Sequence, residues 1–227
     1  MIPRSVNVAA RLDAAARDIF PEGLGVAVLD PRVFYAGLAP DEAAALAGTV
    51  PRRAREFTAG RVAARRAMRE IGFLDRSVPA GVDRAPIWPD GLVGSIAHSA
   101  ERCVAVVAPA ADWSSLGVDI EPDAPLEETL WDSVLRPEEL AWLDARPAGD
   151  RARLARLIFS AKECAYKCQY PLTRALLDFD DFSIAIEAGA FHARFQRPVS
   201  PFGQGAALSG RWTAAEGALL TALALRP

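Results

Sequence analysis

Two segments of this chain, 102 residues apart, follow the same nine-residue pattern. Residues 57–65 read FTAGRVAAR and residues 159–167 read FSAKECAYK, so both fit F-[ST]-A-x-x-x-A-x-[RK]. Similarity at a fixed offset is typical of a duplicated structural unit. We therefore expect two similar halves, residues 1–112 and 113–227, with a site between them. Chance agreement between two amphipathic helices is the alternative.

Helix and strand signals are mixed within each half, which favours an α+β fold. Ala and Arg dominate residues 41–72, where Pro51 marks a break between two helices. A second helical region is expected from Pro137 to about Gln169, with an interruption at residues 146–149. Strands are expected within residues 93–108, where a turn separates two of them, and at residues 116–121, 182–187, 191–195 and 219–225.

The composition limits the kind of protein that this can be. Hydrophobic residues make up 51% of the 227 positions, which is enough for a sizeable core. No apolar run approaches the roughly 18 to 20 residues of a membrane helix, and charges interrupt the first twenty positions, so we expect a cytoplasmic protein. Cys103, Cys164 and Cys168 are too few for a disulfide framework and are expected in the core. The net charge of −3 argues against a nucleic-acid partner.

The sharpest chemical signal is the pair of carboxylates at Asp119 and Glu121, at the end of an expected strand. Alternate residues of a strand point to one face, so the two acids lie together while Val118 and Ile120 are buried opposite. Neighbouring carboxylates repel unless a cation lies between them, and Mg²⁺ binds one or two carboxylates together with water and phosphate oxygens. A magnesium site is the hypothesis, and a strand end with solvated acids is the alternative.

A second signal is the charged group Lys162, Glu163 and Lys167 in the expected second helical region. Glu163 and Lys167 are four residues apart and share one helical face. An ordinary surface ion pair would explain this spacing. However, the helix is apolar over much of its circumference, which favours a charged group that faces a site.

Positive charge is concentrated between residues 52 and 69, where seven arginines accompany one acid, Glu56. Arginines at every fourth position would form one stripe, with Arg53 and Arg61 about 12 Å apart at 1.5 Å per residue. That reach suits a ligand with separated phosphates, and a solvated helix face is the alternative. His98, at an expected strand end, is a further candidate, although a lone histidine is more often structural. The sequence has no P-loop, nucleophile-elbow or dinucleotide-binding motif.

Five motifs, taken in order, resemble those of the 4′-phosphopantetheinyl transferase superfamily. They are Arg-x-x-Glu-Phe-x-x-Gly-Arg at 53–61, Arg-x-Pro-x-Trp-Pro-x-Gly at 84–91, Gly-Ser-Ile-Ala-His-Ser at 94–99, Gly-Val-Asp-Ile-Glu at 117–121 and Phe-Ser-Ala-Lys-Glu-x-x-x-Lys at 159–167. No single motif is decisive, but five in this order and spacing are specific. The chain resembles the monomeric type, which activates surfactin, enterobactin and similar siderophore, peptide and polyketide synthetases.

The resemblance implies two similar α+β halves with coenzyme A in the cleft between them. The N-terminal half would hold the adenosine and phosphates, and the C-terminal half would hold Mg²⁺. The implied magnesium ligands are Asp119, Glu121 and Glu163. The implied coenzyme contacts are Arg53, Arg61 and Arg84 at the adenosine and its 3′-phosphate, His98 and Lys167 at the pyrophosphate, and Lys162 as a further contact. Glu163, Lys167 and His98 would be the catalytic residues, with Glu163 as the candidate base.

The implied reaction is attack by a serine of an apo acyl- or peptidyl-carrier protein on the β-phosphate of coenzyme A, with release of 3′,5′-ADP. Two other functions remain open at this point. One is a metal-dependent hydrolase of coenzyme A or of the loaded carrier, and the other is a non-catalytic coenzyme A sensor. Two departures from the family pattern, Ala97 in place of Ser or Thr and no lysine at residues 77–83, make the affinity for coenzyme A uncertain.

The surface that would receive the carrier is expected just after Lys167. Charge is a poor candidate for docking, because the chain carries −9 outside residues 52–69, where the net charge is +6. Apolar contacts are therefore expected, from Tyr170, Leu172, Leu176 and Leu177, with Arg174 as the one useful charge. Burial of these side chains in the core is an equally good alternative.

Overall fold

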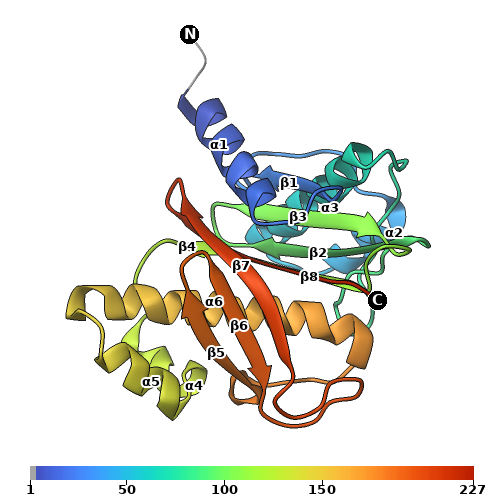
Figure 1. Cartoon of the computed structure of the whole chain (residues 1–227). Coiled ribbons are helices and arrows are strands. Elements are labelled where there is room, and N and C mark those ends of the chain that lie inside the picture. The colour runs from blue at the N-terminus through green and yellow to red at the C-terminus, as the bar shows by residue number, and fades with distance from the viewer. Residues whose placement is uncertain (1–3) are drawn as a thin grey trace.

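The computed structural model describes residues 4–227 and consists of two halves, each built from one antiparallel sheet and its helices (Figure 1). The predicted α+β class is confirmed. The N-terminal half contains α1 (Arg4–Asp18), β1 (Gly25–Leu29), α2 (Pro40–Ala43), α3 (Pro51–Glu70), β2 (Leu92–His98) and β3 (Cys103–Pro109). The C-terminal half contains β4 (Ser115–Pro122), α4 (Trp131–Val134), α5 (Pro137–Asp144), α6 (Ala148–Thr173), β5 (Phe182–Glu187), β6 (Ala190–Phe195), β7 (Ala207–Ala215) and β8 (Ala218–Leu225).

The two halves follow one construction plan. Each begins its sheet with a strand, continues into a long helix, and ends with a strand that pairs antiparallel with the first, giving the orders β1-β3-β2 and β4-β8-β7-β6-β5. A glycine on the first strand lets the long helix approach closely. An added Cβ would lie 1.9 Å from the carbonyl oxygen of Ala67 at Gly25, and 2.3 Å from that of Cys164 at Gly117. The repeated segments lie on these helices, α3 and α6, which supports a duplication.

The halves meet edge to edge along β2 and β4, where the amide of Val118 donates to Oγ of Ser95 at 3.2 Å. One core runs through this junction. Its fully buried members include Leu12, Val104 and Val106 from the first half and Leu116, Val118, Ile120 and Leu220 from the second. Leu116, Val118 and Ile120 therefore face inward, as the alternation in the sequence predicted.

Two further cores fix the long helices to their sheets. Small side chains of α3 pack against β1 and β3. Apolar side chains of α6 pack against β5 and β6. Leu177, in the segment that follows α6, belongs to the same core. All three cysteines are free and buried, as expected for core packing.

The structure also contains elements that the sequence did not indicate. Helix α1 precedes the first predicted helix, and β7 lies between β6 and β8. Helix α6 continues past Gln169 and through Pro171 to Thr173, where Arg174 caps it with a left-handed backbone (φ 56°) and donates its amide to the carbonyl of Tyr170.

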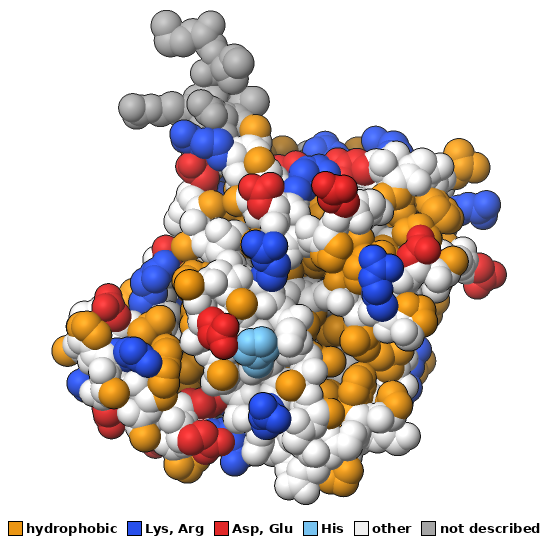
Figure 2. Space-filling view, viewed as in Figure 1, with side chains coloured by type: hydrophobic (Ala, Val, Ile, Leu, Met, Phe, Trp, Pro, Cys, Tyr) orange, Lys and Arg blue, Asp and Glu red, His pale blue; other side chains and the backbone are white. Residues whose placement is uncertain are grey.

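Figure 2 shows how side chains are distributed on one face of the molecule. Scattered charged and hydrophobic side chains lie over the sheet in front of α6, whereas hydrophobic side chains gather on the right, beside the end marked C in Figure 1. No helix within residues 4–227 has both the length and the apolar character needed to cross a membrane.

Candidate active site

Asp119 projects from β4 toward α6, where side chains of that helix, Ser160 and Lys167, contact its two carboxylate oxygens. Oγ of Ser160 donates to Oδ2 of Asp119 at 2.9 Å, and the same hydroxyl lies 2.9 Å from Oγ1 of Thr221 on β8. Asp119 is only 4% exposed. A buried carboxylate with an orienting hydroxyl is positioned rather than solvated, which argues against the simple strand-end alternative.

Lys167 reaches the other oxygen of Asp119 from about two turns further along α6 than Ser160. Its Nζ atom lies 2.5 Å from Oδ1 of Asp119 and 3.8 Å from Oε2 of Glu163. Burial lowers the pKa of Lys167, but the two carboxylates outweigh that effect and raise it above its ordinary value. The side chain of Lys167 is therefore positively charged at neutral pH. Burial raises the pKa of Glu163, and the charge of Lys167 opposes this rise.

Glu121 lies on the same strand face and is paired with a residue that the sequence analysis did not identify. Nη1 of Arg156 donates to Oε2 of Glu121 at 2.9 Å, and Nη2 donates to the carbonyl of Pro125 at 2.9 Å. Burial, followed by the charge of Asp119, raises the pKa of Glu121 to about 7 even beside this arginine. The sequence could have indicated Arg156 as a site residue, because it lies seven residues before Glu163 and so shares a helical face with it.

Lys167 contacts both Asp119 and Glu163, and burial, together with the charge of Asp119, raises the pKa of Glu121 and of Glu163. Within residues 4–227, no three His, Cys, Asp or Glu side chains are already grouped closely enough to hold a metal ion. The cations Lys167 and Arg156 lie on these carboxylates instead. The magnesium assignment therefore stays a prediction.

His98, at the end of β2, is fixed by α3 of its own half. Its Nε2 atom lies 2.7 Å from Nη1 of Arg53, and its Nδ1 atom lies 3.6 Å from Oε2 of Glu56. Arginine can only donate, so Nε2 accepts and the proton is on Nδ1, toward Glu56. Burial lowers the pKa of His98, and the charge of Glu56 opposes this effect. The preceding residue, Ala97, points the other way, into the shared core.

Arg61, another predicted arginine contact, is less exposed than Arg53. Arg61 is 6% exposed, its Nε donates to the carbonyl of Val78 at 2.7 Å, and its guanidinium lies 4.0 Å from the centre of the Phe57 ring. Burial lowers the pKa of Arg61 to about 10. A side chain in this position supports the fold, and the assignment of Arg61 as a coenzyme contact stays a prediction.

The rest of the predicted arginine stripe is divided among separate partners. Arg65 pairs with the fully buried Glu42 at 2.6 Å, and Arg69 pairs with Asp75 at 2.7 Å. The stripe therefore does not act as one continuous anion site. An i, i+4 spacing drifts around the helix, so successive side chains reach different neighbours.

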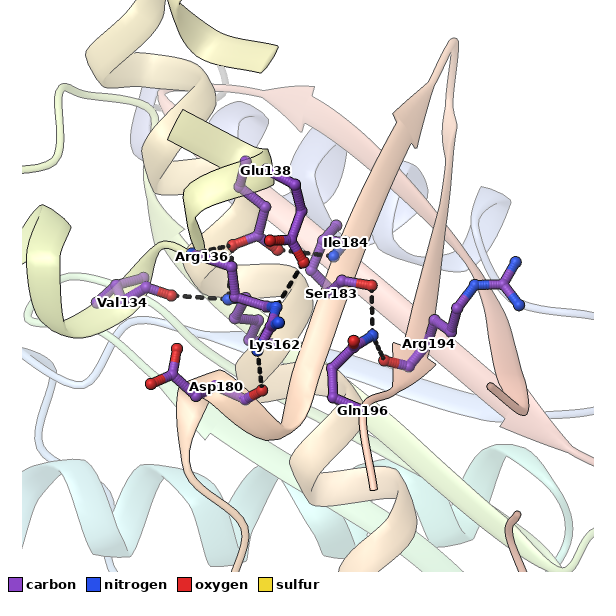
Figure 3. A network of polar contacts seen from close by, with 10 residues as sticks. Val134, Arg136, Glu138, Lys162, Asp180, Ser183, Ile184, Arg194 and Gln196 are labelled. Carbon is purple, nitrogen blue, oxygen red and sulfur yellow. Dashed lines mark hydrogen bonds and ion pairs between the residues drawn. The ribbon is translucent and has the colours of Figure 1, made fainter. Parts of the chain in front are cut away.

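Lys162 takes part in a buried ion pair within the C-terminal half. It is 1% exposed, and its Nζ donates to Oε2 of Glu139 and to the carbonyl of Val134, each at 2.7 Å. Glu139 in turn accepts from the amides of Arg136 and Ile184, so the ion pair joins α5, α6 and β5 (Figure 3). Lys162 stabilises this part of the fold, and its assignment as a coenzyme contact stays a prediction.

A pocket of about 590 Å³ lies where the halves meet. Its walls are residues 83–88 and β2 on one side and the last turns of α6 on the other, with Arg84 and Lys167 among the lining side chains. Lys167 therefore connects this pocket to Asp119. A smaller pocket of about 190 Å³, lined by Glu163, Leu177, Phe179 and Phe182, lies on the other side of Tyr166, which lines both.

The side chains suggested for carrier docking divide into two groups. Leu177 is part of the core around α6, whereas Leu176 is 77% exposed. Tyr170, Leu172 and Arg174 line the larger pocket. The core alternative thus holds for Leu177, and Leu176 is available on the surface.

A charged lysine that lines the pocket between two like halves and contacts two carboxylates is suited to a site for phosphorylated ligands. Comparison with protein families agrees and is more specific. Residues 41–108 match the 4′-phosphopantetheinyl transferase N-terminal domain, and residues 115–205 match the 4′-phosphopantetheinyl transferase superfamily.

Individual proteins of this kind are similar over most of the chain. The 4′-phosphopantetheinyl transferase Svp of Streptomyces mobaraensis is 43% identical over 83% of this chain and 78% of its own length. The transferase Npt of Nocardia iowensis is 37% identical over 82% of this chain and 88% of its own. Enterobactin synthase component D of Salmonella typhi is 40% identical over 51% of this chain and 48% of its own. The chain belongs to the 4′-phosphopantetheinyl transferase superfamily.

Proposed function

We propose that this protein is a Mg²⁺-dependent phosphopantetheinyl transferase, which moves the 4′-phosphopantetheine arm of coenzyme A to a serine of an apo acyl- or peptidyl-carrier protein. The observation that carries this proposal is Lys167, which joins the Asp119 and Glu163 carboxylates to the pocket between the halves. A phosphorylated ligand in that pocket would lie beside the charged Lys167 and close to the carboxylates of Asp119 and Glu163. Family membership supports the same reaction.

The donor set fits Mg²⁺. Asp119, Glu121 and Glu163 supply carboxylate oxygens, which are the ligands that this ion prefers, and Ser160 orients the first of them. Burial, followed by the charge of Asp119, raises the pKa of Glu121, and a cation bound at this carboxylate would oppose both effects. A bound Mg²⁺ would supply charge neutralisation at the pyrophosphate.

The side chains of the protein have distinct proposed roles in the transfer. Glu163 borders the smaller pocket and would accept the proton of the carrier serine as its oxygen attacks the β-phosphate of coenzyme A. The bond to the leaving 3′,5′-ADP then breaks. His98 and Arg53 would contact phosphate groups from the first half, and Arg84 would do so from the wall of the larger pocket. Lys167 would turn from Asp119 toward the pyrophosphate.

Both halves contribute to one site within a single chain, which supports a monomeric enzyme. Coenzyme A and the free, buried cysteines are compatible with action in the cytoplasm. The partner is a carrier protein, for which the exposed Leu176 beside the pocket is a candidate contact.

The test is mass spectrometry of apo-carrier panels incubated with coenzyme A, Mg²⁺ and the protein. A carrier that gains the arm, together with released 3′,5′-ADP, is the expected result. Coenzyme A that is split without any carrier would indicate a hydrolase. Bound but intact coenzyme A, with every carrier unchanged, would indicate a sensor.

A further inference from the structure

The loop between α3 and β2 forms a small hairpin at the wall of the larger pocket. The amide of Gly81 donates to the carbonyl of Ala85 at 2.8 Å, and the amide of Arg84 donates to the carbonyl of Gly81 at 2.9 Å. Arg84, near its tip, has a left-handed backbone (φ 66°). Val82 and Ile87 are exposed, so packing contributes little to hold this hairpin in place. Its position must depend on other contacts.

Asp83 supplies such contacts in two directions. Its Oδ1 atom accepts from the amide of Ala85 at 3.0 Å, within the hairpin. Its Oδ2 atom accepts from the hydroxyl of Tyr170 at 2.8 Å and from Nη1 of Arg174 at 3.4 Å, at the end of α6. One carboxylate therefore joins the wall from the first half to the wall from the second.

The α6 side of this connection is the firmer one. The ring of Tyr170 stacks on that of Tyr166 with centroids 5.7 Å apart. The guanidinium of Arg174 also lies over the Tyr170 ring, 5.7 Å from its centroid. Asp83, Tyr166, Tyr170 and Arg174 all line the larger pocket. The joined groups thus bridge the pocket itself and not a remote surface.

We infer that Asp83 is a positioning residue, which with Tyr170 clasps the residue 79–87 hairpin across the pocket and retains the bound coenzyme. This inference rests on the proposed function only for the identity of the ligand. Hydrogen bonds at a solvent-exposed position contribute modestly, so the clasp can open for entry and close again. Loss of the clasp should mainly speed ligand dissociation, because it removes no group assigned to the reacting phosphate.

Tyr170→Phe is the sharpest variant, because it removes the hydroxyl and keeps the ring that stacks on Tyr166. Asp83→Asn is the second variant and serves alone if the first does not fold. The matched control is Asp144→Asn, which alters a comparable exposed pair with Arg151 at 3.3 Å, away from both pockets.

The first measurement uses hydrogen–deuterium exchange of the full chain without ligand. The amides of Gly81, Arg84 and Ala85 should exchange about 3- to 10-fold faster in both clasp variants and at the parent rate in the control. The second measurement uses calorimetry and stopped-flow kinetics with coenzyme A. Its Kd and dissociation rate should rise about 3- to 10-fold, and KM should rise more than kcat falls.

The outcomes separate the two proposals. Unchanged hairpin exchange in both variants would overturn the clasp itself. Faster exchange with unchanged coenzyme dissociation would overturn its role in retention. A parent protein that binds no coenzyme A would overturn the proposed function, and with it retention, even where the exchange result shows that the hairpin is clasped.

Discussion

The ammonium group of Lys167 lies 2.5 Å from Oδ1 of Asp119, so the second half of the protein places its own cation on the carboxylate expected to bind a metal. A cation this close to the carboxylate competes electrostatically with a metal ion for the same oxygen. Binding of Mg²⁺ at Asp119 is therefore favoured when Lys167 turns toward a phosphorylated ligand in the adjoining pocket, which Lys167 also lines.

The first prediction follows from this competition. Lys167→Met should bind Mg²⁺ at least about tenfold more tightly than the parent when coenzyme A is absent, because a charge that competes for Asp119 is gone. Transfer should nevertheless slow, since the pyrophosphate loses its contact. Calorimetry with Mg²⁺ alone gives the affinity, and an equal or weaker affinity in the variant would contradict the competition.

The second prediction concerns Asp119 directly. Asp119→Asn keeps the shape of the side chain and its contact with Ser160, so the fold should survive. Mg²⁺ affinity and transfer should each fall at least about 100-fold, because a charged ligand is lost. Circular dichroism checks the fold, and Asp112→Asn, an exposed acid with no assigned role, is the control. Transfer at the parent rate in limiting Mg²⁺ would remove Asp119 from the site.

The third prediction is a pH dependence set by Glu121, whose pKa is raised from 4.5 to about 7. A proton on Glu121 competes with Mg²⁺, so metal affinity should increase by about tenfold between pH 6 and pH 8 and then level off. The effect on stability has the opposite sign. The folded state holds this proton more tightly than the unfolded state, so the contribution is complete below pH 4.5 and is lost as the pH rises through 7.

Both parts of this dependence can be measured in the same buffers. Calorimetry gives the affinity, and urea unfolding without metal gives the free energy of unfolding. Glu121→Gln should flatten both dependences across this range. A Mg²⁺ affinity that is independent of pH in the parent would rule out Glu121 as a ligand with this pKa.

The fourth prediction separates two arginines that the sequence treated alike. Arg53→Ala should raise KM for coenzyme A more than it lowers kcat, because its guanidinium at His98 is available to phosphate. Arg61→Ala should instead lower the free energy of unfolding by about 2 kcal/mol, because it removes a buried contact to Val78. Dephospho-coenzyme A is the control ligand, which a variant without the 3′-phosphate contact should no longer distinguish. Equal KM effects with unchanged stability would favour the original stripe.

The fifth prediction tests the buried pair of Lys162 and Glu139, whose side chains are 1% and 2% exposed. Glu139→Gln leaves a buried ammonium group without its counter-ion and should lower the free energy of unfolding by about 3 kcal/mol. The double variant Lys162→Met with Glu139→Gln should recover most of that loss, since it removes both charges and keeps a side-chain oxygen that can accept from a backbone amide. If the single variant is as stable as the parent, the network of Figure 3 does not carry the assigned stabilisation.

The sequence predicted best those features that depend on local periodicity. Alternation in β4 separates Asp119 and Glu121 from the buried Leu116, Val118 and Ile120 without any knowledge of other strands. The four-residue spacing of Glu163 and Lys167 likewise placed both on the correct face of α6. These patterns follow from backbone geometry alone.

The partners of long side chains were not predictable in this way. The choice of Val78 by Arg61, and of Glu139 by Lys162, depends on segments that only the folded chain brings near. Strand β7 was missed for a related reason, because its Ala, Ser and Gly residues have weak strand propensity and its pairing with β6 and β8 supplies the order. Helix α6 extends beyond its predicted end because Pro171 removes only its own amide donor, while the amide of Arg174 still donates to the carbonyl of Tyr170 and closes the last turn.

The core that passes through the junction of β2 and β4 has a consequence for how such a protein can be made. If the chain were cut after residue 112, Leu12 and Val104 would lose cover on one fragment, and Leu116 and Ile120 on the other. Each fragment would then expose an apolar surface that its complement, or a second copy of itself, could cover. A single continuous polypeptide holds the two surfaces at a high effective concentration. Synthesis as one chain therefore ensures that each half finds the partner that covers its apolar surface.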